Sequence, residues 1–174
     1  MKTIILGMGN TLFSDDGAGI AVAQRLGELI PQNGDIAVRE TSWGGLRLLD
    51  LLSGYDRAVI IDAIQTGQKP PGYVHRFSPA DFVHSVRMVS FHDLNFAAVL
   101  EFARRLGIPM PEEISIYAIE VEETEVMAEQ MTPAVCRAVG ECALSILAEI
   151  EDGGCFNWQL PIGSCQLPIE KLDR

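Results

Sequence analysis

Three side chains that suit a divalent metal ion stand at the ends of separate predicted elements. Asp16 follows an apolar run at residues 4–8, Asp62 ends the run R-A-V-I-I-D, and His92 stands in S-F-H-D before a helical pattern. Two carboxylates and one imidazole suit nickel, zinc or manganese, with coordination positions left open for another ligand. The spacing alone leaves open whether these residues share one site.

The stretch G-M-G-N-T-L-F-S-D-D-G predicts a strand that turns sharply into a functional loop. Gly7 and Gly9 permit backbone torsions that a side chain forbids, and Asn10 tolerates similar ones. We expect Asp15 to cap the helix that follows. Because one cap needs one carboxylate, Asp16 is left as a candidate ligand or proton-transfer group. A doubly acidic helix start without a chemical role is the alternative.

Nucleotide binding is disfavoured by the same stretch. G-M-G-N-T-L lacks the third glycine of G-x-G-x-x-G, and two acids would face a pyrophosphate at the helix start. The G-x-G-N start resembles that of peptidyl-tRNA hydrolases, but a net charge of −11 opposes binding to a polyanion. A flavodoxin-like nucleotide binder is a further alternative, which the absorbance of a bound cofactor would reveal.

The other reactive side chains lack a catalytic pattern. His75 and His84 have no acidic partner at a telling spacing and are assigned no role. No G-x-S-x-G turn is present, and the sequence puts no cysteine beside His92. If the protein is a hydrolase, we therefore expect activated water to be the attacking group.

Composition indicates a single domain. The 174 residues are 48% apolar, which suits one core over 1–150, with a partly ordered tail at 151–174. No apolar stretch approaches the ~20 residues of a membrane span, and the start lacks a signal peptide, so we expect a cytoplasmic protein. The four cysteines form no zinc pattern, and Cys136 and Cys142 are interpreted as small helix residues. Cys155 and Cys165 are expected to be free thiols in the tail, with pairing or metal binding as the alternatives.

Strands and helices are predicted to alternate, which indicates an α/β fold with a mostly parallel sheet. Predicted strands are 2–6, 36–40, 57–62, 73–77 and 114–119, and predicted helices are 17–30, 46–52, 93–106 and one starting at 132. The helical period predicts inner faces made of Ile20, Ala23, Leu26 and Ile30 in the first helix and of Phe96, Leu100, Ala103 and Leu106 in the third. The strand at 73–77 follows its predecessor without a helix, so it should be an antiparallel edge strand. Ligands bind beyond the carboxyl ends of such sheets, where Asp16 and Asp62 are expected to converge.

These motifs together resemble the endopeptidases that mature nickel-iron hydrogenases. The resemblance spans roughly residues 1–150 and rests on these segments in order: G-M-G-N-T-L-F-S-D-D-G-A-G, W-G-G-L-R-L-L, I-D-A, P-G, S-F-H and T-P-A-V. It implies a three-layer sandwich in which helices cover both faces of a twisted five-stranded sheet. It also implies removal of a C-terminal extension from the hydrogenase large-subunit precursor once nickel has been inserted.

The resemblance also assigns roles to residues. Asp16, Asp62 and His92 are expected to contact metal, and Asp16 and Asp62 to be catalytic in an aspartic-type peptidase. The nickel is expected to belong to the substrate, with cadmium or zinc able to substitute in vitro. A non-catalytic escort that binds the large subunit through the same residues is the alternative. Nucleic-acid binding and membrane insertion are not expected.

One departure from the family pattern lies beside the expected site. Many relatives carry D-G-G-T where this chain has Glu40-Thr41-Ser42-Trp43. Gly9, Asn10, Glu40 and Trp43 are expected to bind substrate. For Trp43, two roles are open: a contact that docks the precursor, or an aromatic lid over the core.

Overall fold

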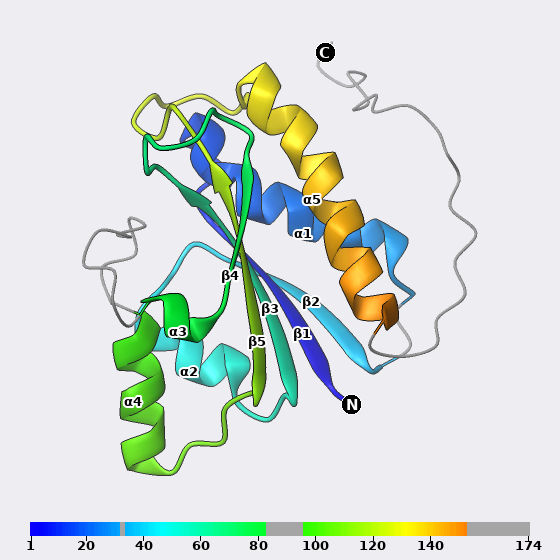
Figure 1. Cartoon of the computed structure of the whole chain (residues 1–174), viewed down its shortest axis with the longest axis vertical. Helices are drawn as coiled ribbons and strands as arrows, with labels where there is room; N and C mark the ends of the chain where they lie inside the picture. The colour runs from blue at the N-terminus through cyan, green and yellow to red at the C-terminus, as the bar shows by residue number, and fades with distance from the viewer. Residues whose placement is uncertain (32–33, 83–95, 153–174) are drawn as a thin grey trace, which may run out of the picture.

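The computed structural model describes residues 1–31, 34–82 and 96–152 (Figure 1). Its strands are β1 (Thr3–Met8), β2 (Ile36–Thr41), β3 (Arg57–Ile64), β4 (Val74–Phe77) and β5 (Glu113–Glu120). Its helices are the 3₁₀ turn η1 (Ser14–Gly17), α1 (Ala18–Leu29), α2 (Arg47–Leu52), α3 (Pro79–Phe82), α4 (Phe96–Leu106) and α5 (Pro133–Asp152). None of the helices in these ranges is long and apolar enough to cross a membrane.

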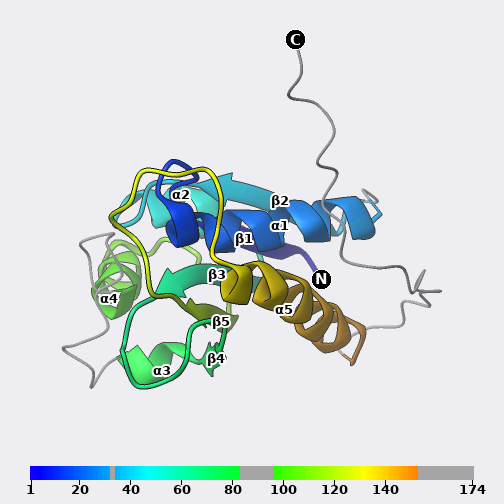
Figure 2. The same cartoon turned by 90° about the horizontal axis from the view of Figure 1, so that it is seen from above.

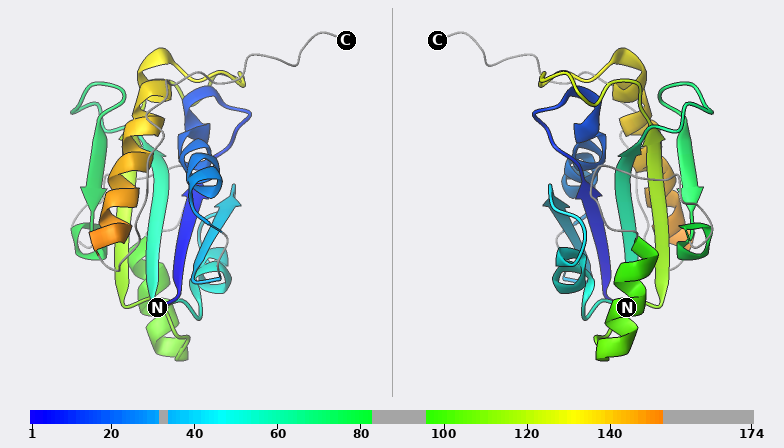
Figure 3. Two further views of the ribbon diagram at one scale, coloured as in Figure 1. Left: turned by 90° about the vertical axis from the view of Figure 1, so that its right-hand side faces the viewer. Right: turned by 90° about the vertical axis from the view of Figure 1, so that its left-hand side faces the viewer.

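The strands form one five-stranded sheet in the order β2-β1-β3-β5-β4. The pairs among β2, β1, β3 and β5 are parallel, whereas β4 pairs antiparallel with β5 at the edge. Figure 3 shows β4 running opposite to its neighbours. The predicted α/β class and the antiparallel edge strand are confirmed.

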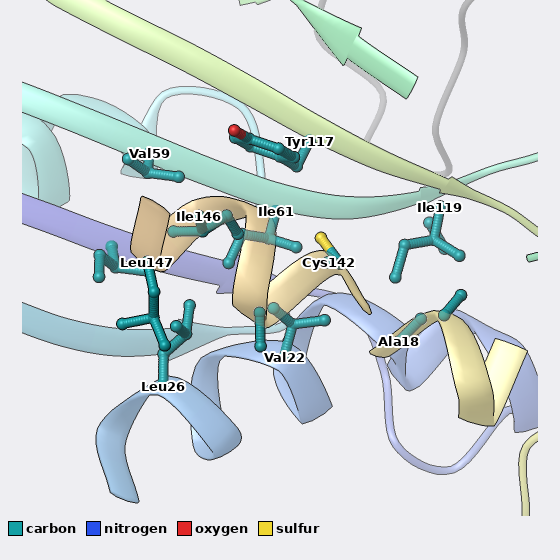
Figure 4. Packing of buried hydrophobic residues seen from close by; sticks show 14 of the residues in the cluster. Ala18, Val22, Leu26, Val59, Ile61, Tyr117, Ile119, Cys142, Ile146 and Leu147 are labelled. Atoms are coloured by element: carbon teal, nitrogen blue, oxygen red, sulfur yellow. The ribbon is translucent and has the colours of Figure 1, made fainter. Parts of the chain in front are cut away.

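Helices cover both faces of the sheet, as expected for three layers (Figure 3). On one face, α1 and α5 pack on apolar residues that include Val59, Ile61 and Ile119 (Figure 4). On the other face, α2 and α4 pack on a second cluster that contains Ile60 and Leu6. Successive residues of a central strand therefore point into two different cores, which explains why the central strands are continuous apolar runs in the sequence.

Several strands extend beyond their predicted ends. β3 continues past Asp62 to Ile64, because Ile64 still pairs with Glu120 of β5. β1 likewise continues through Gly7 to Met8, which pairs with Thr41. Asp62 was expected to be the last residue of its strand; it instead lies inside the strand.

Helix faces were largely predicted, with one error in α4. Ile20, Ala23, Leu26 and Ile30 are all buried at α1, as expected. Leu106 was assigned to the inner face of α4, but it is 58% exposed because it is the last residue of a helix that extends past the strands (Figure 3). The last helix also continues to Asp152, two residues into the region expected to be tail.

Candidate functional site

The candidate site lies where the chain reverses its direction across the sheet. β1 stands between β2 and β3, so the connections that leave the carboxyl ends of β1 and β3 diverge there. The start of α1 is pressed against this point: a Cβ on Gly19 would overlap the carbonyl oxygens of Met8 and Ile61. Helix α1 therefore needs a glycine there to approach both strands, and it brings the preceding turn η1 to within 8 Å of β3.

Asp16 lies in η1 and is oriented by its own loop. Its carboxylate accepts a hydrogen bond of 2.9 Å from the Asn10 backbone N–H. Gly9 has a φ of +141°, and a Cβ at Gly9 would overlap the carbonyl oxygen of Asp16. The loop thus closes tightly on itself, and the half-buried Asp16 carboxylate is held at the carboxyl end of β1.

Asp15 does not cap α1, contrary to expectation. The N-cap of α1 is Gly17, which makes no side-chain capping bond. The fully buried Asp15 carboxylate instead accepts hydrogen bonds from the Thr132 N–H at 2.7 Å and hydroxyl at 3.0 Å. Since Pro133 starts α5, Asp15 fastens the start of a helix that is distant in sequence.

The loop after β1 is held along its length by the segment 121–132, which joins β5 to α5. The Ser14 N–H donates to the Ala128 carbonyl at 2.6 Å, and the Ser14 hydroxyl donates to the Gln130 carbonyl at 3.1 Å. Ser14 has a φ of +35°, a strained value for a residue with a side chain. These bonds hold that conformation two residues from Asp16. No pattern in the sequence predicts this pairing of two loops.

Asp62 approaches the same edge from β3. It follows Ile61, whose carbonyl abuts α1, and it shares the face of Ile60 because side chains alternate along a strand. One of its carboxylate oxygens accepts the Ala63 N–H at 2.9 Å. Helices α2 and α4 cover that face, whereas Asp16 precedes α1 on the opposite face. Both residues thus belong to the carboxyl edge of the sheet, and their predicted convergence on one site stays a prediction.

His92 and His84 lie outside the described residues. Among residues 1–31, 34–82 and 96–152, no three His, Cys, Asp or Glu side chains are grouped as metal ligands. The expected metal set of Asp16, Asp62 and His92 therefore stays a prediction.

The expected substrate-binding residues Glu40 and Trp43 belong to β2 and to the loop that follows it. The Gly9 N–H donates to the Thr41 carbonyl at 3.2 Å, which joins the loops after β1 and β2. Trp43 is 66% exposed in the second loop, with the Arg47 guanidinium 5.9 Å from its ring centre. Such exposure fits a docking contact rather than a lid over the core. Glu40 is also exposed and accepts a hydrogen bond from Gln24 at 3.2 Å.

A buried Glu120 at the end of β5 was missed by sequence reasoning. Its carboxylate accepts hydrogen bonds from the N–H groups of Thr66 and Gly67 at 2.7 and 2.8 Å, and from the Thr66 hydroxyl at 2.7 Å. His75 Nε2 lies 2.8 Å from Glu120 Oε2, so this histidine does have an acidic partner. Burial raises the pKa of Glu120, but the hydrogen bonds outweigh it and lower the pKa. Glu120 thus fixes the loop that follows β3.

The cysteines of α5 are structural. Cys142 is fully buried, and burial raises the pKa of its thiol to about 12. Cys136 is half-buried, and both are free, as expected for small helix residues. Cys155 and Cys165 lie outside the described residues.

This mostly parallel sheet, with helices on both faces, defines a three-layer α/β protein. A family model described as hydrogenase maturation protease matches residues 20–149. The chain belongs to the hydrogenase maturation protease family. The matched range contains Asp62 and starts four residues after Asp16.

Individual relatives agree with this assignment. The hydrogenase 2 maturation protease of Escherichia coli is 25% identical over 158 residues, covering 88% of this chain and 93% of that protein. A HupD protein of Thiocapsa roseopersicina is 26% identical, covering 99% of this chain and 79% of that protein.

Solved structures of the same family share the fold. The maturating endopeptidase HybD of Escherichia coli superposes with a TM-score of 0.72 at 26% identity, covering 88% of this chain and 94% of that one. HycI of Thermococcus kodakarensis, at 22% identity and a TM-score of 0.62, covers 87% of this chain and 92% of that one and shares the fold. The expected architecture is therefore confirmed.

Proposed function

We propose that this protein is the endopeptidase that removes a C-terminal extension from a nickel-iron hydrogenase large-subunit precursor after nickel insertion. The observation that carries the proposal is that Asp16 and Asp62 stand at one edge of the sheet in a chain of the hydrogenase maturation protease family. A peptidase that uses water as its nucleophile needs a group beside the scissile bond to take up the proton of that water, and a carboxylate can do this.

In this proposal the nickel is part of the substrate. Asp16, Asp62 and His92 contact the metal that the precursor carries, so a precursor without nickel is not positioned for cleavage. The carboxylates supply oxygen donors of the kind that divalent metals accept, and a backbone N–H orients each of them. Cadmium or zinc in the precursor is expected to substitute in vitro.

The chemistry is hydrolysis with water as the nucleophile. Water attacks the scissile carbonyl, the C–N bond breaks, and the proton from water passes to the leaving amine. A carboxylate of the Asp16 and Asp62 pair takes up and returns that proton, which makes the enzyme aspartic-type. Support comes from the absence of a nucleophile pattern in the sequence and from the inert, buried Cys142.

The test is the mass of a cognate large-subunit precursor after incubation with the protein, with nickel-loaded and nickel-free precursor compared. The proposal expects loss of a C-terminal peptide from the loaded form alone. Cleavage of both forms would overturn the nickel requirement. Binding of the loaded precursor without cleavage would overturn the peptidase and support an escort.

A further inference from the structure

Three large apolar side chains are exposed on two neighbouring loops, one of which leads into Asp16. Leu12, Val126 and Met127, here called the apolar rim, are 55%, 52% and 75% exposed. The Ala128 N–H donates to the Leu12 carbonyl at 3.1 Å, and Phe13 bridges to Ala128, so the two loops are joined at the rim. Figure 2 shows the loop after β1 next to the loop before α5.

The part of the apolar rim at Val126 and Met127 follows a turn that is fixed by side-chain hydrogen bonds. Glu123 accepts hydrogen bonds from the N–H groups of Glu125 and Val126, at 2.8 and 2.9 Å. These bonds lower the pKa of the Glu123 carboxyl and fix the backbone just before Met127. Exposed apolar side chains on a fixed turn are typical of a surface that a partner covers.

The charges around the rim are of one sign. Segments 9–17 and 121–132 contain six acidic residues and no lysine or arginine. Asp15 and Glu123 are committed to hydrogen bonds within the fold, whereas Glu122, Glu125 and Glu129 are exposed. A partner that covers the rim must therefore bring apolar side chains together with lysine or arginine. A second copy of this chain, with a net charge of −11, would be repelled there.

We propose that the apolar rim docks the precursor segment next to the scissile bond, and that this segment has apolar side chains flanked by lysine or arginine. The inference rests on the proposed function. The Asp16 N–H donates to the Phe13 carbonyl at 2.8 Å, so Phe13, which is next to Leu12 in the chain, is hydrogen-bonded to the proposed catalytic residue Asp16. Because Leu12 precedes Asp16 by four residues, their Cα atoms are at most about 14 Å apart, and a substrate extended past Asp16 at about 3.3 Å per residue reaches Leu12 within about five residues.

The test compares binding and cleavage of the nickel-loaded precursor. Replacing Val126 and Met127 together with serine should weaken binding and raise KM roughly tenfold, with kcat unchanged, because the substituted groups contact substrate away from the reacting bond. Leu144→Ser on α5 is the matched control: Leu144 is 51% exposed, and its loss should change neither value. Circular dichroism verifies that all variants are folded.

A charge variant tests the second half of the proposal. Glu125→Lys combined with Glu129→Lys should weaken binding at low salt and flatten its dependence on salt. Unchanged binding by both rim variants, or dimerisation of the wild-type chain through the rim in sedimentation, would overturn the proposal. If the wild type binds without cleaving and the rim variants bind less, the peptidase fails and the docking surface stands. If the wild type does not bind the precursor, both fail.

Discussion

The carboxylate of Asp15 accepts both hydrogen bonds that Thr132 can donate, from its N–H at 2.7 Å and its hydroxyl at 3.0 Å. Asp15 is fully buried, and its neighbour Asp16 turns toward the Asn10 N–H. The adjacent residues Asp15 and Asp16 thus have different partners and different structural roles. Asp15 joins the loop after β1 to the start of α5, and Asp16 is held at the edge of the sheet.

Removing either partner of this bond pair should loosen that loop. Asp15→Ala leaves two donors without their acceptor and should lower the free energy of unfolding by about 3 kcal/mol, whereas Thr132→Val removes one donor and should cost about 1 kcal/mol. Urea denaturation measures both. Equal costs for the two variants would contradict the bidentate role of Asp15.

The two candidate catalytic carboxylates should be needed for chemistry and not for folding. The asparagine in Asp16→Asn and in Asp62→Asn keeps a side-chain oxygen that can accept the hydrogen bond from the neighbouring backbone N–H. Each variant should lower the rate of precursor cleavage at least ~100-fold. Asp50→Asn on α2 is the control, since Asp50 is exposed outside the site. Cleavage by either site variant at the wild-type rate would remove that residue from the mechanism.

Gly19 should be required for the close approach of α1 to the sheet. Gly19→Ala forces a Cβ against the carbonyl oxygens of Met8 and Ile61 and should lower the free energy of unfolding by about 1–3 kcal/mol. Gly27→Ala, on the same helix, meets only Val38 at 4.0 Å and should raise stability by up to about 1 kcal/mol. Thermal unfolding distinguishes the two, and similar effects would mean that α1 can shift freely.

Acid should destabilise the fold through the buried Glu120 and the half-buried Glu149. Burial raises the pKa of Glu120 and Glu149, but hydrogen bonds outweigh burial and lower both pKa values below the ordinary 4.5. The stability that they contribute is therefore complete above that value and is lost as the pH falls through the lowered pKa. Urea unfolding from about pH 7 to about pH 3 measures the decline.

The variant Glu120→Gln measures how much Glu120 alone contributes to the pH dependence of stability. An amide cannot accept from all the donors of Thr66, Gly67 and His75, so the variant should be less stable at neutral pH. Its stability should also fall less steeply below about pH 4.5. A slope identical to the wild type would show that Glu120 keeps an ordinary pKa.

Pattern and local chemistry determined much of this protein. Continuous apolar runs predicted the buried strands, and the helical period predicted the inner face of α1, because burial selects residue type position by position. The sequence also placed Asp16 and Asp62 at the carboxyl ends of neighbouring strands, since parallel strands share one edge.

Only the tertiary structure decided which part of the fold Asp15 holds. Asp15 and Asp16 have the same chemistry in the sequence, and a helix cap was a reasonable local assignment for Asp15. Its partner Thr132 lies 117 residues away, and His75 meets Glu120 45 residues away, at distances along the chain that no local pattern encodes. Hydrogen bonds between distant loops depend on how the strands are ordered in the sheet, and that order is settled by packing of the whole core.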